Sequence, residues 1–101
     1  MLKHIVWWTL KDEAEGATGA ENGRKMLEML RGLEGRIPSL RSIDVSMEFL
    51  GSTTEPCQII LLSTHDDAEG LKAYAEHPEH MKCVEFIKKI VASRKAIDFI
   101  V

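Results

Sequence analysis

The chain has 101 residues, which fits one domain over residues 1–101 and leaves no room for a second core. Its composition, 45% hydrophobic and 29% charged, is typical of a soluble globular domain and disfavours the disordered, collagen-like and coiled-coil classes. The formal net charge is -3 without any basic stretch, so we expect no nucleic-acid partner.

Neither an export signal nor a membrane-spanning stretch is recognisable, so we expect a cytoplasmic protein without a membrane partner. The apolar start soon reaches charged residues, and no apolar run approaches the ~20 residues that cross a bilayer. Cys57 and Cys83 lie in apolar runs without metal-ligand or redox spacing. We interpret them as small buried thiols, with a disulfide or a reactive thiol as the alternatives.

The first half of the chain predicts two strands and a helix. Residues 4–10 are rich in β-branched and aromatic side chains and predict a strand. Thr18 and Glu21 form a capping-box signature ahead of apolar residues at helical spacing, so a helix is expected over 18–36. Apolar and polar residues then alternate over 40–50, the pattern of a half-exposed strand.

A turn, a strand and a short helix follow. The turn-forming residues 51–56 are expected to connect neighbouring antiparallel strands, the second of them over 57–64. Asp66, with Glu69 three residues later, is expected to cap a short helix. The inward-facing positions of that helix would be Leu71, Tyr74 and Ala75.

Pro78 divides the second helical region. It disfavours helical geometry at His77 and suits the first turn of a new helix, which we expect over 78–92 with His77 as its cap. A last strand is predicted over 96–101. The buried stripe of the second helical piece would consist of Met81, Val84, Ile87 and Val91.

The order β-α-β-β-α-β predicts a ferredoxin-like α+β fold, in which one antiparallel sheet carries helices on one face. Both faces of this sheet look apolar: in the strand 57–64, Ile59 and Leu61 oppose Ile60 and Leu62. We therefore predict a homodimer that joins the free sheet faces. The alternative is an exposed apolar surface that needs no partner.

Three titratable residues are the candidates for catalysis. If His4 lies on the helix-facing side of its strand with Val6 and Trp8, its ring points toward Tyr74 and His80. A neutral imidazole can exchange a proton near neutral pH, and a tyrosine hydroxyl can donate to a developing oxyanion, a pairing suited to enolate or aldol chemistry. A purely structural hydrogen-bonded cluster is the competing interpretation.

A metal site is not expected. A His-x-x-His pair, His77 and His80, has its first member at a helix start and offers poor shared geometry for a metal with Glu79. The sequence also lacks a glycine-rich phosphate loop and the Gly-x-Ser-x-Gly motif of hydrolases. No cofactor is expected.

Four pieces of the sequence resemble the Dabb family, the stress-responsive dimeric A/B barrel domains. They are Lys-His-Ile-Val at 3–6, Ile-Pro-Ser-Leu at 37–40, the block Leu-Lys-Ala-Tyr-Ala-Glu-His-Pro-Glu-His at 71–80, and Asp-Phe at 98–99. The resemblance covers essentially the whole chain. It implies a ferredoxin-like dimer in which two sheets close an α/β barrel.

The resemblance also implies a candidate activity. Some plant members are polyketide cyclases that perform an intramolecular aldol condensation with a strand histidine, the tyrosine of the block and its final histidine, which fall on His4, Tyr74 and His80 here. Other members have no assigned reaction, so whether this chain is an enzyme stays open. We expect a small hydrophobic or aromatic carbonyl ligand in an interior pocket, with cofactor-free cyclase or lyase chemistry. A non-catalytic stress-response or assembly protein is the alternative. The expected pocket side chains are Val6, Trp8, Leu61 and Phe86.

Overall fold

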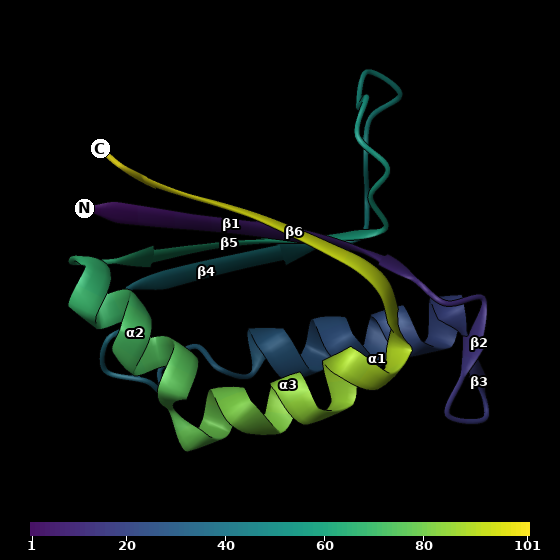
Figure 1. Cartoon of the computed structure of the whole chain (residues 1–101), viewed down its shortest axis with the longest axis horizontal. Helices are drawn as coiled ribbons and strands as arrows, with labels where there is room; N and C mark the ends of the chain where they lie inside the picture. The colour runs from purple at the N-terminus through teal and green to yellow at the C-terminus, as the bar shows by residue number, and fades with distance from the viewer.

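The computed structural model describes all of residues 1–101 as one antiparallel sheet with a layer of helices (Figure 1). The sheet has the strand order β4-β5-β1-β6, and every neighbouring pair is antiparallel. Its strands are β1 (Leu2–Leu10), β4 (Ser42–Ser46), β5 (Ile59–His65) and β6 (Val91–Ile100). The helices are α1 (Gly19–Arg31), α2 (Ala68–Glu76) and α3 (Pro78–Ile90).

This arrangement is the ferredoxin-like α+β fold predicted from the sequence. Figure 1 shows all three helices on one side of the sheet. The segment between β4 and β5 projects from the other side, and it joins two antiparallel strands as expected. An additional two-stranded hairpin, β2 (Glu13–Ala14) with β3 (Ala17–Thr18), precedes α1. No helix is both long enough and apolar enough to span a membrane.

Helix α1 begins as predicted and ends earlier. The Thr18 hydroxyl accepts a hydrogen bond from the Glu21 backbone N–H, and the Glu21 carboxylate accepts one from Thr18, so the capping box is complete. The expected end at residue 36 is wrong. The helix ends at Arg31, because Gly32 caps it and Gly35 has a φ of 80°, a conformation that favours glycine.

Two boundaries in the middle of the chain also differ. Of the strand predicted over 40–50, only Ser42–Ser46 forms a strand, β4, because the residues after Ser46 leave the sheet for the projecting segment. The α2 cap is Asp67, whose carboxylate accepts a hydrogen bond from the Gly70 N–H. Asp66, the expected cap, instead forms a bidentate ion pair with Arg41.

The break between α2 and α3 is confirmed, with Pro78 in the first turn of α3 and His77 as its cap. The His77 Nδ1 accepts a hydrogen bond from the Glu79 N–H at 3.1 Å. The predicted buried stripe of α3 is only partly correct: Met81 is 43% exposed, Val84 is half-buried, and Val91 lies beyond the helix as the first residue of β6. The buried residues of the helix are Cys83, Ile87 and Ile90.

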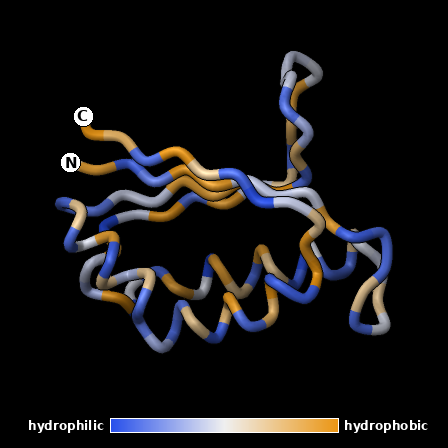
Figure 2. The backbone as a smooth tube through the Cα atoms, in the orientation of Figure 1, coloured by the Kyte–Doolittle hydropathy of each residue, from blue (hydrophilic) through white to orange (hydrophobic).

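The strands carry apolar side chains on both faces, as predicted, and Figure 2 shows hydrophobic residues recurring along them. The helix-facing side of β1 and β5 is buried under the helices, with Val6 2% and Leu61 1% exposed. Trp7 and Trp8 point to opposite faces: Trp8 is buried among the core residues, whereas Trp7 is half-buried on the outer face. The outer face therefore keeps apolar side chains that no helix covers.

Candidate active site

A cavity of about 290 Å³ lies between the sheet and the helices α2 and α3. Ten of its fourteen lining residues are hydrophobic, among them the predicted pocket residues Val6, Trp8 and Leu61. His4, Tyr74 and His80 also line it, so the structure brings the three predicted site residues to one space. The cavity therefore combines an apolar surface with a few polar groups, as small-molecule sites do.

Phe86 was predicted to line the pocket, and the structure shows otherwise. It lies on a different side of α3, where its ring is packed under the Lys25 ammonium, 4.7 Å from nitrogen to ring centroid. The cause is helical periodicity: Val84 and Ile87 line the cavity, so Phe86 between them faces α1.

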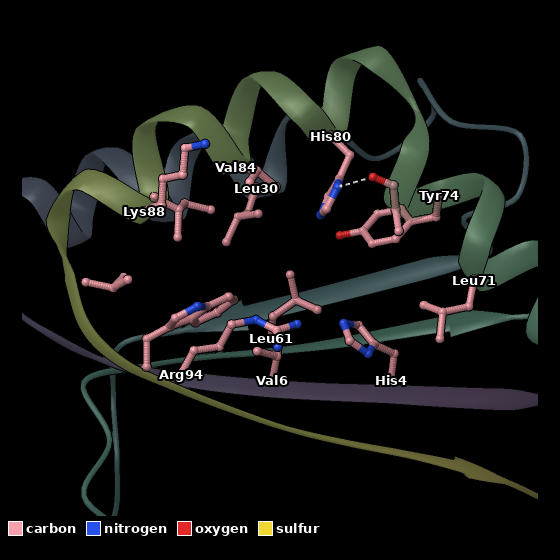
Figure 3. Close-up of a pocket in the computed structure, with 14 residues that line it drawn as sticks. His4, Val6, Leu30, Leu61, Leu71, Tyr74, His80, Val84, Lys88 and Arg94 are labelled. Atoms are coloured by element: carbon pink, nitrogen blue, oxygen red, sulfur yellow. Dashed lines mark hydrogen bonds between the residues drawn. The ribbon is translucent and has the colours of Figure 1, made fainter.

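Tyr74 and His80 face each other across the α2–α3 break. Their ring centroids are 4.4 Å apart, and Figure 3 shows the phenol end of Tyr74 turned toward His80 and the cavity. Tyr74 is only 2% exposed, and its hydroxyl forms no hydrogen bond with another protein group. Burial raises the pKa of Tyr74 well above its usual range, so the hydroxyl stays protonated and can donate a hydrogen bond to a ligand.

The hydrogen bond of His80 fixes its tautomer, and burial of the ring determines its charge. Its Nδ1 lies 3.0 Å from the Ala75 carbonyl oxygen, which can only accept, so Nδ1 carries the proton. Nε2 is then left as a proton acceptor. Burial lowers the pKa of His80, an effect that the Ala75 carbonyl opposes and the nearby positive charges of His4, Arg94 and His77 reinforce. The ring is therefore neutral at neutral pH and able to act as a base.

His4 is held by a carboxylate from the neighbouring strand. Its Nδ1 is hydrogen-bonded to Oδ1 of Asp98, which lies directly opposite on β6. The ring centroid of His4 lies 6.5 Å from that of Tyr74, and Figure 3 shows the imidazole pointing from β1 into the cavity. The carboxylate fixes the proton on Nδ1 and leaves Nε2 for a ligand.

A fourth ring, His65, belongs to the cluster and was not predicted to do so. The strand predicted over 57–64 stops one residue short, because β5 includes His65 and buries it completely. Its Nδ1 donates to the Ser39 carbonyl at 2.8 Å, and its Nε2 accepts from the Ser63 hydroxyl at 2.9 Å. Both ring nitrogens of His65 are engaged in these hydrogen bonds, so neither is available to a ligand. The His65 ring packs beside that of Tyr74, with 4.9 Å between the ring centroids.

The signal for His65 was available in the sequence. Ile59, Leu61 and Ser63 lie on the helix-facing side, and extending their alternation by one step places His65 beside them. Asp98 had no such signal, because only the register of β6 with β1 sets this acid opposite His4. No group of three or more metal-ligating side chains comes together anywhere in the chain.

The chain belongs to the family of stress responsive A/B barrel domains, the Dabb family, whose family model matches residues 2–101. This confirms the resemblance seen in the sequence. None of the curated proteins compared matches the chain.

Several solved structures share the fold. A dimeric protein of unknown function with a ferredoxin-like fold from Bacteroides fragilis is 27% identical, with a TM-score of 0.84 over 99% of this chain and 95% of its own. A putative antibiotic biosynthesis monooxygenase from Nitrosomonas europaea is 18% identical, with a TM-score of 0.74 over 100% and 98% of the two chains. The hydroxynitrile lyase from Passiflora edulis is 12% identical, with a TM-score of 0.79 over 99% and 92%. The last two likenesses concern the fold alone.

Proposed function

We propose that the protein is a homodimeric α/β barrel that binds a small hydrophobic or aromatic carbonyl compound in the cavity and catalyses proton transfer next to the carbonyl group. One observation carries this proposal: the neutral imidazole of His80, the protonated phenol of Tyr74 and the imidazole of His4 converge on an otherwise apolar cavity. The chemistry would be that of a cofactor-free cyclase or lyase, and some plant members of the Dabb family are polyketide cyclases.

Each of the three groups has a role in such a reaction. The His80 Nε2 removes a proton from the carbon beside the carbonyl, and the negative charge moves to the carbonyl oxygen. The Tyr74 hydroxyl donates a hydrogen bond to that oxygen and so stabilises the enolate. His4, whose ring is oriented by Asp98, contacts the compound from the sheet side of the cavity and positions it.

An aldol cyclisation then balances without another reactant. The enolate carbon attacks a second carbonyl group of the same molecule, and a carbon–carbon bond forms. The oxygen of the attacked carbonyl takes the proton that His80 received. The base returns to its neutral state, and the product is an isomer of the substrate.

The homodimer is supported by the outer face of the sheet. Ile60 lies there beside Trp7, and neither is covered by a helix, while Ile97 and Phe99 of β6 are 53% and 40% exposed. An apolar surface of this kind on a small domain favours a protein contact. The Bacteroides fragilis relative is described as dimeric. We propose that two copies join these faces.

The two cysteines fit the cytoplasmic location expected from the sequence. Cys57 and Cys83 are both free thiols. Free cysteines are typical of reducing compartments, so we propose a cytoplasmic protein. Fractionation of the producing cells tests this, and recovery in an extracellular fraction would contradict it.

The competing function is a non-catalytic one, in which the cluster only ties the helices to the sheet. It is favoured by the hydrogen bonds of His80 to the Ala75 carbonyl and of His4 to Asp98, which could serve structure alone. The two functions can be distinguished by ligand binding, because only the catalytic function requires the cavity to bind a ligand.

A thermal-shift titration with acetophenone separates them. The wild type should unfold at a higher temperature as acetophenone is added, because a ligand that binds only the folded state stabilises it. His80→Gln should lose most of this shift, whereas Met81→Gln, an exposed neighbour outside the cavity, should keep it. No shift in the wild type, with His80→Gln itself strongly destabilised, would favour the structural role.

A further inference from the structure

Arg94 is a positively charged residue of the cavity that the proposed reaction does not use. It lies on β6 opposite Trp8 of β1, so its side chain is on the helix-facing side of the sheet. Figure 3 shows it running along the sheet side of the cavity near Leu61 and Val6. The guanidinium takes part in none of the ion pairs of the protein.

The charges around the cavity are unbalanced. None of the fourteen lining residues is acidic, whereas Arg94 and Lys88 are both cationic. Lys88 is paired with Glu85 at 3.5 Å on the surface of α3, so its charge is partly compensated. Asp98 does not line the cavity, and its carboxylate is hydrogen-bonded to His4. An anionic group in the cavity would therefore meet one free guanidinium and no negative charge.

The position of Arg94 relative to the histidines suits a ligand with two functional ends. In Figure 3, Lys88 and Arg94 enter from one end of the cavity, and His4, Tyr74 and Leu71 lie toward the other. Arg94 reaches from its end along the sheet toward Leu61 and Val6, and ten of the fourteen lining residues are hydrophobic. The volume of about 290 Å³ lies at the lower end of the range of small-molecule pockets, roughly 300–1,000 Å³, which suits a ligand of about one substituted ring.

Resting on the proposed function, we infer that the ligand is a carbonyl compound that also carries a carboxylate, which Arg94 binds while the carbonyl group lies between Tyr74 and His80. A guanidinium matches a planar carboxylate with two parallel hydrogen bonds. The proposed dimer contact uses the opposite face of the sheet, so it leaves this guanidinium free for the ligand.

Two isosteric probes test this inference: 4-acetylbenzoate and 4-acetylbenzamide share the ring and the methyl ketone and differ in charge. Their dissociation constants are measured by isothermal titration calorimetry. The wild type should bind the acid about 5- to 20-fold more tightly than the amide, a range between an exposed ion pair and a bidentate one. Arg94→Gln should abolish the preference by weakening the binding of 4-acetylbenzoate, while the dissociation constant of 4-acetylbenzamide stays the same. Lys72→Gln, an exposed lysine of α2 outside the cavity, should keep it.

The outcomes separate this inference from the proposed function. Equal affinity of the wild type for both probes, or an acid preference that survives in Arg94→Gln, would overturn the carboxylate site and leave carbonyl binding standing. Absence of binding by either probe would contradict the proposed function and this inference together. The unfolding temperature of each variant is recorded first, and Arg94→Lys replaces Arg94→Gln if the latter does not fold. The lysine keeps the charge without the fork and should show a reduced preference.

Discussion

Removing only the hydroxyl of Tyr74 distinguishes a catalytic from a structural cluster. The side chain is 2% exposed and its ring lies against His80 and His65, at 4.4 and 4.9 Å between centroids. The hydroxyl itself has no hydrogen-bond partner in the protein. Tyr74→Phe therefore keeps the ring packing and removes a group that the folded chain does not use.

The expected effects on stability and on reaction rate are far apart. The free energy of unfolding of Tyr74→Phe should stay within about 1 kcal/mol of the wild type, because the substitution keeps the ring and breaks no hydrogen bond. Tyr74→Ala, which removes the buried ring, should lose about 3–5 kcal/mol. Loss of a hydrogen bond to a developing oxyanion costs about 100- to 1000-fold in rate, so Tyr74→Phe should be nearly inactive while fully folded.

Two assays on the same preparations measure these effects. Urea denaturation followed by circular dichroism gives the free energy of unfolding. Proton NMR in D₂O follows the loss of the methyl signal of acetophenone, which reports proton removal beside the carbonyl group. A stability loss above about 1.5 kcal/mol in Tyr74→Phe would show that the hydroxyl has a structural bond and would refute the reasoning. Unchanged exchange in a stable Tyr74→Phe would refute its role as donor.

Three further predictions concern the titration of the buried histidines, the apolar outer face of the sheet, and the pair formed by His4 and Asp98. Burial lowers the pKa of both His65 and His80. As the pH falls, the unfolded chain therefore takes up protons on these two rings at a higher pH than the folded chain does. The free energy of unfolding should therefore fall as the pH drops below about 6.5, as a pH series of urea denaturations would measure. Ile60→Glu should produce a monomer by light scattering at micromolar concentration, because it places a charge in the sheet contact. Asp98→Ala should lower the rate of methyl exchange at least about tenfold, because His4 loses the partner that fixes its proton.

Each of these predictions has a clear contrary result. A free energy of unfolding that rises as the pH falls below about 6.5 would show that the two histidines gain protons on folding. Dimers of Ile60→Glu that match the wild type would place the contact elsewhere. Full exchange activity in Asp98→Ala, together with an intact fold, would remove His4 from the proposed site. Asp44→Ala, an exposed acid on β4, is the matched control for that variant.

The order of strands and helices was predictable because local patterns agree with the final packing. The Thr18 capping box, the Pro78 break and the alternation of the strands each survive in the structure. The errors occurred where tertiary contacts decide. Asp67 takes the cap of α2 because its neighbour Asp66 is drawn to Arg41, a partner 25 residues away. No local pattern reveals that choice.

The candidate site was predictable to the extent that it depends on alternation in β1. His4, Val6 and Trp8 share a face of one strand, and the structure places all three beside Tyr74 and His80. The partners of these residues were harder to foresee. Arg94 joins the cavity only through the register of β6 with β1, and a strand register depends on pairing across the whole chain.

The proposed reaction requires His80 to act as the base toward a carbonyl compound, and deuterium exchange at the methyl group of acetophenone tests this most directly. The wild type should accelerate the exchange above the protein-free rate, and the folded His80→Gln variant should not, while Met81→Gln exchanges like the wild type. No acceleration by the wild type, or equal acceleration by a folded His80→Gln, would contradict the account.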